Sequence, residues 1–130
     1  GIDVDEQLIS VSKSTVEHAI DATIRMFSRK NPPTALFTVD SLMTQGALLA
    51  FRSMGISIPR DVSLIGFDDF NLATFTDPQI TVVAQPVSEI GFAAARLLLE
   101  RLAGNDDPPK HFRFETKLIV RGSVSRRISG

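Results

Sequence analysis

Apolar residues in this chain fall into two patterns, a helical spacing and short continuous runs. Between residues 16 and 27 they recur every three or four positions, which predicts an amphipathic helix that ends before Asn31-Pro32-Pro33. Short apolar runs predict buried strands at 35–39, 62–67 and 80–84. We also expect helices at 42–54 and 87–102, an irregular loop at 70–78, and a half-exposed strand or hairpin at 112–120.

The order of these elements predicts the fold class. Strand and helix patterns alternate along the chain, and buried strands joined by helices form parallel sheets with helices packed on them. No internal repeat or low-complexity tract interrupts this order. We therefore expect an α/β fold with a parallel sheet flanked by helices.

Local signals refine the helix boundaries. Ser14 and Glu17 have the spacing of a capping box at the start of the first helix. Asp40 and Ser41 are both good N-cap residues for the second helix. Gly46 inside that helix should cost about 1 kcal/mol relative to alanine. Its presence predicts that another backbone approaches closely at this point.

Polar side chains follow the predicted strands where each strand ends. Asp40 follows the first strand, Asp68 and Asp69 follow the second, and Gln85 follows the third. Ligands of open α/β sheets bind outside the carboxyl ends of the strands, so these groups should share one rim. Ionised carboxylates accept hydrogen bonds only, which suits a ligand rich in hydroxyl groups such as a sugar or polyol.

Each of these residues also has a simpler interpretation. Asp40 could serve only as a helix cap, although the two roles can coexist. Asp69 could be an acceptor within the loop, and Gln85 could satisfy backbone groups at a strand end. Phe67 and Phe70 could form an apolar wall beside the carboxylates, but such residues belong more often to the core.

Composition narrows the function classes. The chain has 130 residues, of which 43% are hydrophobic and 22% are charged, and its formal net charge is −1. This balance argues against a segment whose main role is to bind phosphate backbones of nucleic acids. Without cysteine, the chain has no thiolate nucleophile, cysteine-ligated zinc or disulfide. Its apolar runs are too short to span a bilayer, and no signal-peptide pattern opens the sequence.

Motifs for catalysis and for metal or cofactor binding are missing from the sequence. His18 and His111 lack a second ligand at metal spacing or a serine nucleophile, and no phosphate-binding glycine loop occurs. We therefore expect no catalytic residues, no metal site and no cofactor. An enzyme that holds Mg²⁺ through the strand-end carboxylates is a weak third candidate, because no nucleophile or phosphate loop accompanies them.

Six short segments occur in a fixed order, and together they resemble one family. They are residues 33–37 (PTALF), Gly46 in the following helix, residues 59–69 (PRDVSLIGFDD), residues 77–86, residues 91–102 and residues 118–123 (LIVRGS). In this order and spacing they resemble the LacI/GalR family of bacterial transcription regulators. The segment 59–69 is the most specific of the six.

This resemblance implies a domain organisation. The family has a periplasmic-binding-protein-like fold of two α/β subdomains with a hinge, of which this chain would hold the C-terminal half. Residues 1–85 would belong to the C-terminal subdomain, and residues 86–109 would be a helix that in the family packs in the N-terminal subdomain. Residues 110–130 would contain the return strand or strands and the tail. The DNA-binding headpiece of the family would lie outside this chain.

The resemblance also implies roles for individual residues. Asp68 matches the family residue that hydrogen-bonds ligand hydroxyls, whereas Asp40, Ser41 and Thr44 depart from the family's asparagine, aspartate and alanine. The expected effector-facing residues are Asp68, Asp40, Gln85, Phe67 and Phe70. The expected dimer-interface residues are Met43, Ala47, Ala50, Leu72 and Phe75.

The leading functional hypothesis is the effector-binding and dimerisation part of a cytoplasmic transcriptional repressor. Its effector would be a sugar or related polyol, free or phosphorylated, and its homodimer would reach operator DNA only through the headpiece. It would have no membrane contact and no enzymatic activity. The alternative is an extracytoplasmic sugar-binding protein of a transport or sensing system, which a signal peptide upstream would reveal. Because the helix at 87–102 is apolar around much of its circumference, we also expect the isolated chain to self-associate.

Overall fold

Four strands form one mixed sheet in the computed structural model, which describes residues 3–126. The strands are β1 (Ala35–Thr38), β2 (Ser63–Phe67), β3 (Thr81–Ala84) and β4 (Lys117–Ile119), and they lie in that order across the sheet. The first three are parallel, and β4 runs antiparallel to β3. The predicted α/β fold class is confirmed, with the return segment contributing one short antiparallel strand at the edge.

One short 3-10 helix and four α-helices connect and extend these strands. They are η1 (Glu6–Leu8), α1 (Val16–Phe27), α2 (Ser41–Met54), α3 (Asn71–Phe75) and α4 (Val87–Leu102). The prediction of an irregular loop at 70–78 was wrong, because α3 lies within it. This helix is too short for a helical period to be visible, and the burial of Ala73 anchors it to the core.

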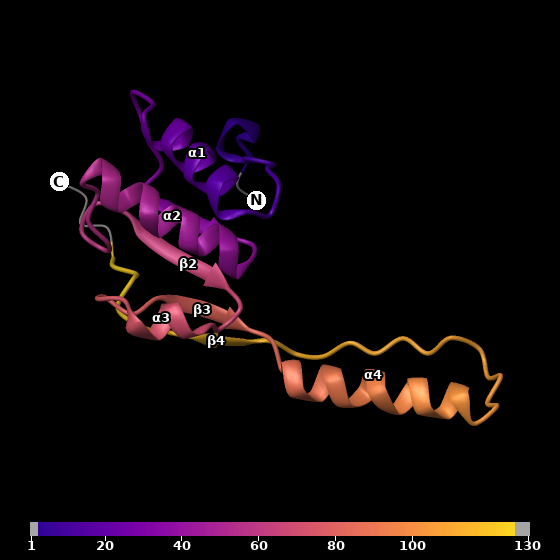
Figure 1. Cartoon of the computed structure of the whole chain (residues 1–130). Helices are drawn as coiled ribbons and strands as arrows, with labels where there is room; N and C mark the ends of the chain where they lie inside the picture. Colours follow the sequence, from indigo (N-terminus) through magenta and orange to yellow (C-terminus); the bar gives the residue numbers. More distant parts are fainter. Residues whose placement is uncertain (1–2, 127–130) are drawn as a thin grey trace.

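The helices α1 and α2 form two successive layers on one face of the sheet (Figure 1). α2 lies over β1 and β2, and α1 packs on α2. Gly46 makes the second contact possible: a Cβ atom there would lie 2.4 Å from Cβ of Ala19 and 2.7 Å from the carbonyl oxygen of Val16. The predicted close backbone approach at Gly46 is therefore confirmed.

The hydrophobic core lies between the sheet, α2, α3 and the C-terminal end of α1. Its buried residues are Met26, Phe27, Ala47, Phe51, Val62, Leu64, Ala73, Ile80 and Val82. Phe27 and Phe51 meet edge to face, with ring centroids 4.7 Å apart. Along β2, Leu64 and Gly66 are buried, whereas the residues that alternate with them are only half-buried.

The caps of the first two helices are linked to one another. Thr15, not Ser14, caps α1, because its hydroxyl accepts the backbone N–H of His18. The capping box predicted at Ser14 is therefore wrong by one residue. The Ser14 hydroxyl instead donates to Oδ2 of Asp40, and Oδ1 of Asp40 accepts the N–H of Met43 at the start of α2. The N-cap prediction for Asp40 is confirmed.

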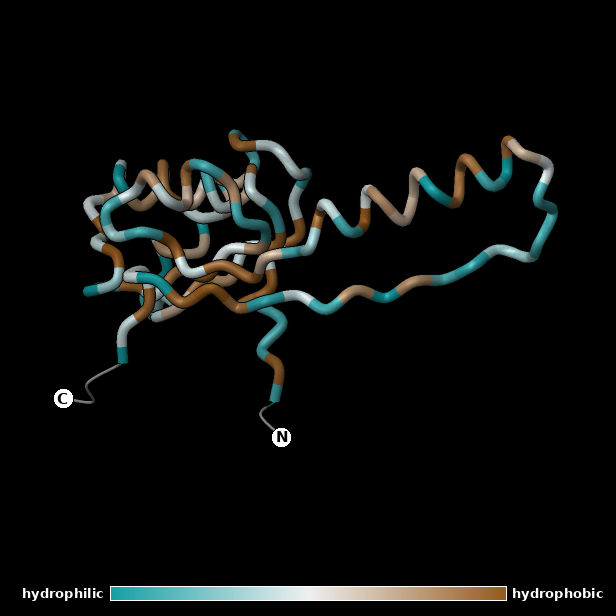
Figure 2. The backbone as a smooth tube through the Cα atoms, turned by 90° about the horizontal axis from the view of Figure 1, so that it is seen from below, coloured by the Kyte–Doolittle hydropathy of each residue, from teal (hydrophilic) through white to brown (hydrophobic). Residues whose placement is uncertain are grey.

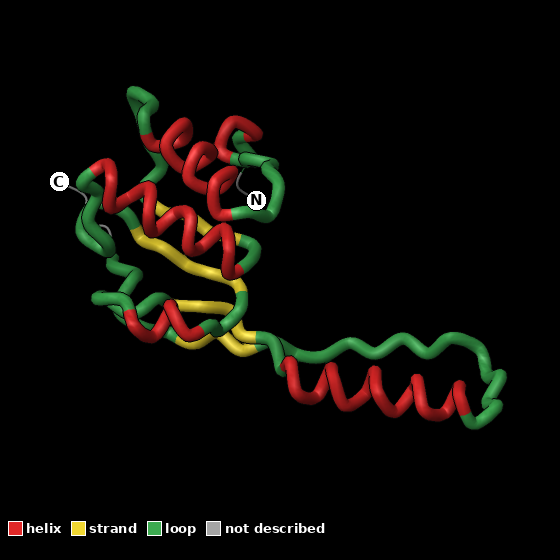
Figure 3. Tube along the Cα trace, in the orientation of Figure 1, coloured by secondary structure: helices red, strands yellow, loops and turns green. Residues whose placement is uncertain are grey.

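The chain after β3 leaves the sheet and returns to it (Figures 1 and 3). We call α4 and the irregular segment 103–116 the arm, and the other described residues the body. No residue of α4 is buried, and Phe92 is 82% exposed. Figure 2 shows apolar residues recurring along this helix although it extends away from the body. Within the described residues, the apolar side chains of α4 are therefore not covered by the body.

Candidate functional site

Asp68 lies directly after the carboxyl end of β2, where the chain turns out of the sheet. Its φ angle of 75° is in the left-handed region, which is uncommon for a residue other than glycine and often marks a functional position. Its backbone N–H donates to the carbonyl oxygen of Val83, at 2.9 Å. This bond extends the β2–β3 pairing and fixes the start of the turn.

Gln85 meets Asp68 from the end of β3. Nε2 of Gln85 donates to Oδ1 of Asp68, at 2.6 Å. Within residues 3–126, no other protein group donates to the Asp68 carboxylate, so its second oxygen, Oδ2, can accept a hydrogen bond. The structure thus brings together two of the five expected effector-facing residues, where the chain passes from β3 to α4.

Asp69 is held by a partner that the sequence analysis did not identify. The guanidinium of Arg121 donates to both carboxylate oxygens of Asp69, each at 2.8 Å. Arg121 follows β4, more than fifty residues later in the chain. A single arginine directly after a predicted strand was the available signal, but sequence spacing did not reveal which carboxylate it would reach.

Asp40 has structural roles for both of its carboxylate oxygens. One caps α2 and the other accepts the hydroxyl of Ser14. Thr44 is fully buried, donates to the backbone carbonyl of Asp40 at 2.8 Å and lies 2.7 Å from the Thr38 hydroxyl. A Cβ atom at Gly66 would lie only 2.8 Å from the Thr44 hydroxyl. The departure to threonine at position 44 is thus accommodated by the glycine on the adjacent strand.

The two expected aromatic residues lie in different surroundings. Phe70 precedes α3 and packs against the hydrophobic core, so the core interpretation fits this residue better than an effector contact. Phe67 ends β2, half-buried, in the alternating set that does not join the core. Its contact with an effector stays a prediction.

Burial changes the expected dimer interface. Ala47 and Ala50 are fully buried inside the chain, so they offer no surface to a partner, and their assignment to the interface needs correction. Met43 is half-buried and lines a hollow beside residues 8–12. Leu72 and Phe75 on α3 are 37% and 83% exposed, respectively. Of the five residues, these last two present the most apolar surface.

Three hollows in the described part of the chain are lined by residues other than Asp68 and Gln85. One, of about 480 Å³, lies between residues 8–12, α1 and β1 and has mainly apolar walls. Another, of about 910 Å³, is an open groove beside β1 and β2 that includes residues 59–61 and 124–126.

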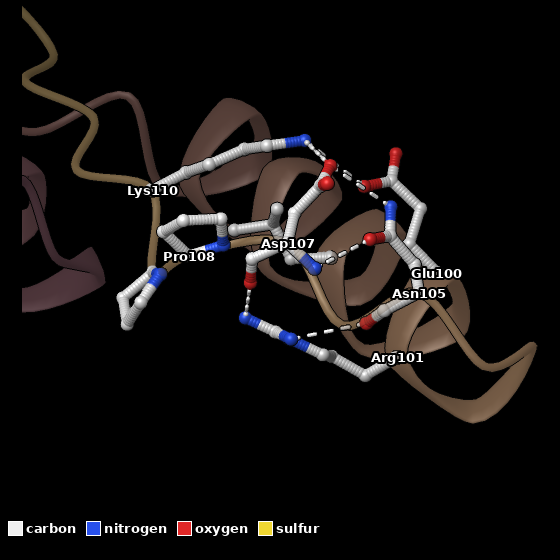
Figure 4. Close-up of a pocket in the computed structure, with 8 residues that line it drawn as sticks. Glu100, Arg101, Asn105, Asp107, Pro108 and Lys110 are labelled. Carbon is white, nitrogen blue, oxygen red and sulfur yellow. Dashed lines mark hydrogen bonds and ion pairs between the residues drawn. The ribbon is translucent and has the colours of Figure 1, made fainter.

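A third hollow, of about 240 Å³, lies at the tip of the arm (Figure 4). Its charged side chains pair with one another: Lys110 lies 3.7 Å from Glu100 and 3.5 Å from Asp107. Arg101 donates to the carbonyl oxygens of Asn105 and Asp107. These contacts close the turn after α4, so this cluster has a structural explanation.

Two further features of residues 3–126 bear on the class of site. No group of three or more histidine, aspartate or glutamate side chains is placed to hold a metal ion. None of the described helices combines the length and apolar character that a membrane crossing requires.

Comparison with known proteins identifies the family. The family model described as "periplasmic binding protein-like domain" matches residues 1–124 of this chain. The chain belongs to this family. Its curated relatives include the HTH-type transcriptional regulator MalR of Streptomyces coelicolor, which is 39% identical over 94% of this chain and 35% of its own length. The HTH-type transcriptional repressor CytR of Escherichia coli is 38% identical over 95% of this chain and 36% of its own length.

Solved structures of the family agree with this assignment. The complex of the transcriptional regulator CelR with cellobiose superposes with a TM-score of 0.86 and 34% identity, over 94% of this chain and 37% of that one. The resemblance to LacI/GalR regulators is confirmed by these relatives. This member of the periplasmic binding protein-like family spans just over a third of the length of the curated relatives named here.

Proposed function

We propose that this chain is the C-terminal part of the effector-binding domain of a bacterial transcriptional repressor. Its effector is a sugar or related polyol, and Asp68 binds hydroxyl groups of that effector. The observation that carries the proposal is the half-buried Asp68 carboxylate at the carboxyl end of β2, with Gln85 on Oδ1 and an acceptor position left on Oδ2. CelR, a structural relative, is described in complex with cellobiose, which supports the same class of ligand.

The proposed domain division follows the body and the arm. Residues 1–85 belong to the C-terminal subdomain, residues 86–109 pack in the N-terminal subdomain of the complete regulator, and residues 110–130 return to the sheet. The exposed apolar residues of α4 support this division, because a helix of this kind is stable mainly when its apolar side is covered. Residues 1–2 and 127–130 of these ranges lie outside the described part of the chain.

The proposed mechanism is a shift in the closure of two subdomains. An effector can shift such an equilibrium only by the difference between its affinities for the two states. Asp68 and Gln85 lie where β3 leads into the arm, so a ligand that bridges them to the second subdomain would favour the closed state. Through a dimer, closure would change the spacing of two DNA-binding headpieces. The regulator would act in the cytoplasm, without enzymatic activity, and would reach DNA only through those headpieces.

The test of the effector site begins with the complete regulator. A thermal-shift screen of sugars and sugar phosphates identifies the ligand, because ligand binding to the native state raises the unfolding temperature. Calorimetry with Asp68→Ala should then show a loss of about 2–3 kcal/mol in binding free energy, the cost of a lost hydrogen bond to a charged group. Asp61→Ala, which removes an exposed carboxylate from another loop, is the matched control. Unchanged affinity in Asp68→Ala would remove this residue from the site.

Asp40 can be tested separately for its two proposed roles. Asparagine caps helices as well as aspartate does, so Asp40→Asn should leave stability nearly unchanged. A loss of effector affinity in this variant would then report a ligand contact. Unchanged affinity would leave Asp40 with the capping role that the structure displays.

The proposed homodimer uses the exposed apolar residues of α3. Leu72 and Phe75 would be buried against a second copy, with Met43 at the margin. Phe75→Asp in the complete regulator should shift its sedimentation from dimer to monomer. An unchanged dimer in this variant would exclude α3 from the interface.

A further inference from the structure

Two adjacent carboxylates are held by two different connections between the body and the arm. Asp68 accepts from Gln85, which lies where the chain leaves the body. Asp69 accepts from Arg121, which lies shortly after the chain has returned through β4. The acidic turn after β2 is thus tied to both the outgoing and the returning segment.

The Arg121 side chain has the features of a fixed structural contact. Its side chain is only 13% exposed, and it meets Asp69, 31% exposed, with two parallel hydrogen bonds. Such two-point contacts between planar groups fix orientation better than a single ion pair does. The same guanidinium donates to the carbonyl oxygen of Ile80, at 3.0 Å, and the Arg121 backbone N–H donates to the Thr81 hydroxyl.

These contacts join the two ends of the segment 69–80. Asp69 is its first residue and Ile80 its last, and one guanidinium binds both. The segment includes α3, so its ends would separate if the turn after β2 changed direction. Arg121 therefore holds the turn from the far side of this loop.

The left-handed backbone of Asp68 needs such support. On its N-terminal side, the bond from its N–H to Val83 holds it in register with β3. On its C-terminal side, the next residue is Asp69, whose oxygens are both occupied by Arg121.

We propose that Asp69 and Arg121 are positioning residues, which hold the Asp68 carboxylate in the orientation that binds Gln85 and the effector. The part that concerns the effector rests on the proposed function. The part that concerns Gln85 does not, because it is a property of this chain alone. A merely structural ion pair would stabilise the fold without controlling the Asp68–Gln85 contact.

The first experiment uses the side-chain amide signals of the ¹⁵N-labelled chain by NMR. The signal of the Gln85 side-chain amide is assigned because it disappears in Gln85→Ala. The Asp68→Asn variant then shows the chemical shift of this signal when the charged acceptor is lost. Asp69→Asn and Arg121→Lys should each move the Gln85 signal toward its position in Asp68→Asn. Arg121→Lys keeps the positive charge but cannot form the two-point contact, so it tests geometry apart from charge.

Asp61→Asn is the matched control for these variants. It also removes a carboxylate that accepts two hydrogen bonds from an arginine, Arg60, but in an exposed loop. The Gln85 signal should not move in this control. A Gln85 signal that stays in place in both Asp69→Asn and Arg121→Lys, in chains that remain folded by circular dichroism, would overturn the proposal.

The second experiment measures effector affinity in the complete regulator, with a sugar that the thermal-shift screen identifies. Asp69→Asn should weaken effector binding about tenfold, because a misdirected Asp68 carboxylate loses part of its charged hydrogen bond to the effector. Asp61→Asn should leave effector binding unchanged. Affinity unchanged in Asp69→Asn, for a sugar whose binding needs Asp68, would overturn positioning toward the effector. If no sugar binds the unaltered regulator but the Gln85 signal moves, the proposed function fails and the positioning role stands.

Discussion

The helices α2 and α4 are similar in length and in their content of alanine, leucine and phenylalanine, yet they differ in burial. In α2, Thr44, Gly46, Ala47, Ala50 and Phe51 are buried against α1 and the sheet. In α4, no side chain is buried. Apolar content and periodicity therefore predict that a segment forms a helix, but not whether its partner lies in the same chain. Within the described residues, the body covers the apolar side of α2 but leaves that of α4 exposed.

Replacing a phenylalanine by alanine should give the largest difference in stability between the body and the arm. Phe51 is buried and packs on Phe27, so Phe51→Ala should lower the free energy of unfolding by about 3–5 kcal/mol. Phe92→Ala, in the exposed arm, should change it by less than about 0.5 kcal/mol. The chain has no tryptophan or tyrosine, so urea unfolding should be followed by far-UV circular dichroism. Equal losses in the two variants would mean that α4 packs on the body.

A glycine-to-alanine pair should give effects of opposite sign. Gly46→Ala places a Cβ atom against Ala19 and Val16, and forced overpacking should cost roughly 1–3 kcal/mol. Gly91→Ala adds a Cβ with no atom within 4 Å and should stabilise α4 by about 0.5–1 kcal/mol. Thermal unfolding and helix content at 222 nm measure both. A neutral Gly46→Ala would contradict the close packing of α1 on α2.

The exposed arm should make the isolated chain self-associate. Contiguous apolar surface of this kind tends to be covered by a second molecule in water. Phe92→Asp should weaken that association about tenfold, which corresponds to about 1.4 kcal/mol, without lowering the stability of the body. Light scattering at high micromolar concentration measures it. A strict monomer before any substitution would contradict this prediction.

The smallest expected effect is the pH-dependent contribution of one ion pair of the body to stability. The Arg60 guanidinium, followed by the backbone N–H of Ser57, lowers the pKa of Asp61 from its ordinary 3.8 to about 2. A lowered pKa means that the contribution of Asp61 to stability is present above its ordinary pKa and is lost as the pH falls toward 2. Asp61→Asn should therefore differ from the unaltered chain at pH 5 and converge with it near pH 2. Urea unfolding midpoints of both chains, measured from pH 5 to pH 2, test this convergence. A difference between the two midpoints that stays constant over this range would contradict a contribution of the ion pair to stability.

The sequence predicted most of the body, because its signals are local. The apolar period of α1, the runs that form the three parallel strands and the Asp40 cap all depend on residues close in the chain. The prediction that the run 35–39 is buried was wrong, because β1 lies at the edge of the sheet with Phe37 52% exposed and Val39 61% exposed. Gly46 also indicated a close backbone approach correctly. The short helix α3 escaped prediction because its position depends on Ala73 reaching the core, which is a tertiary contact.

The candidate site was predictable only in part, for the same physical reason. The placement of Asp68 and Gln85 at strand ends follows from the rule that parallel strands share a carboxyl edge. The contact of Asp69 with Arg121 joins residues far apart in the chain, and no spacing rule could select that pair. Likewise, the burial of Ala47 and Ala50 depends on how α1 and the sheet pack against α2, so their expected role in a dimer could not be corrected from sequence.

The most direct test of the central claim is a crystal structure of the complete regulator with its sugar effector bound. The account predicts a ligand hydroxyl within hydrogen-bond distance of the Asp68 carboxylate, with Arg121 still on both oxygens of Asp69. A sugar bound between the two subdomains without any contact to Asp68 would contradict it.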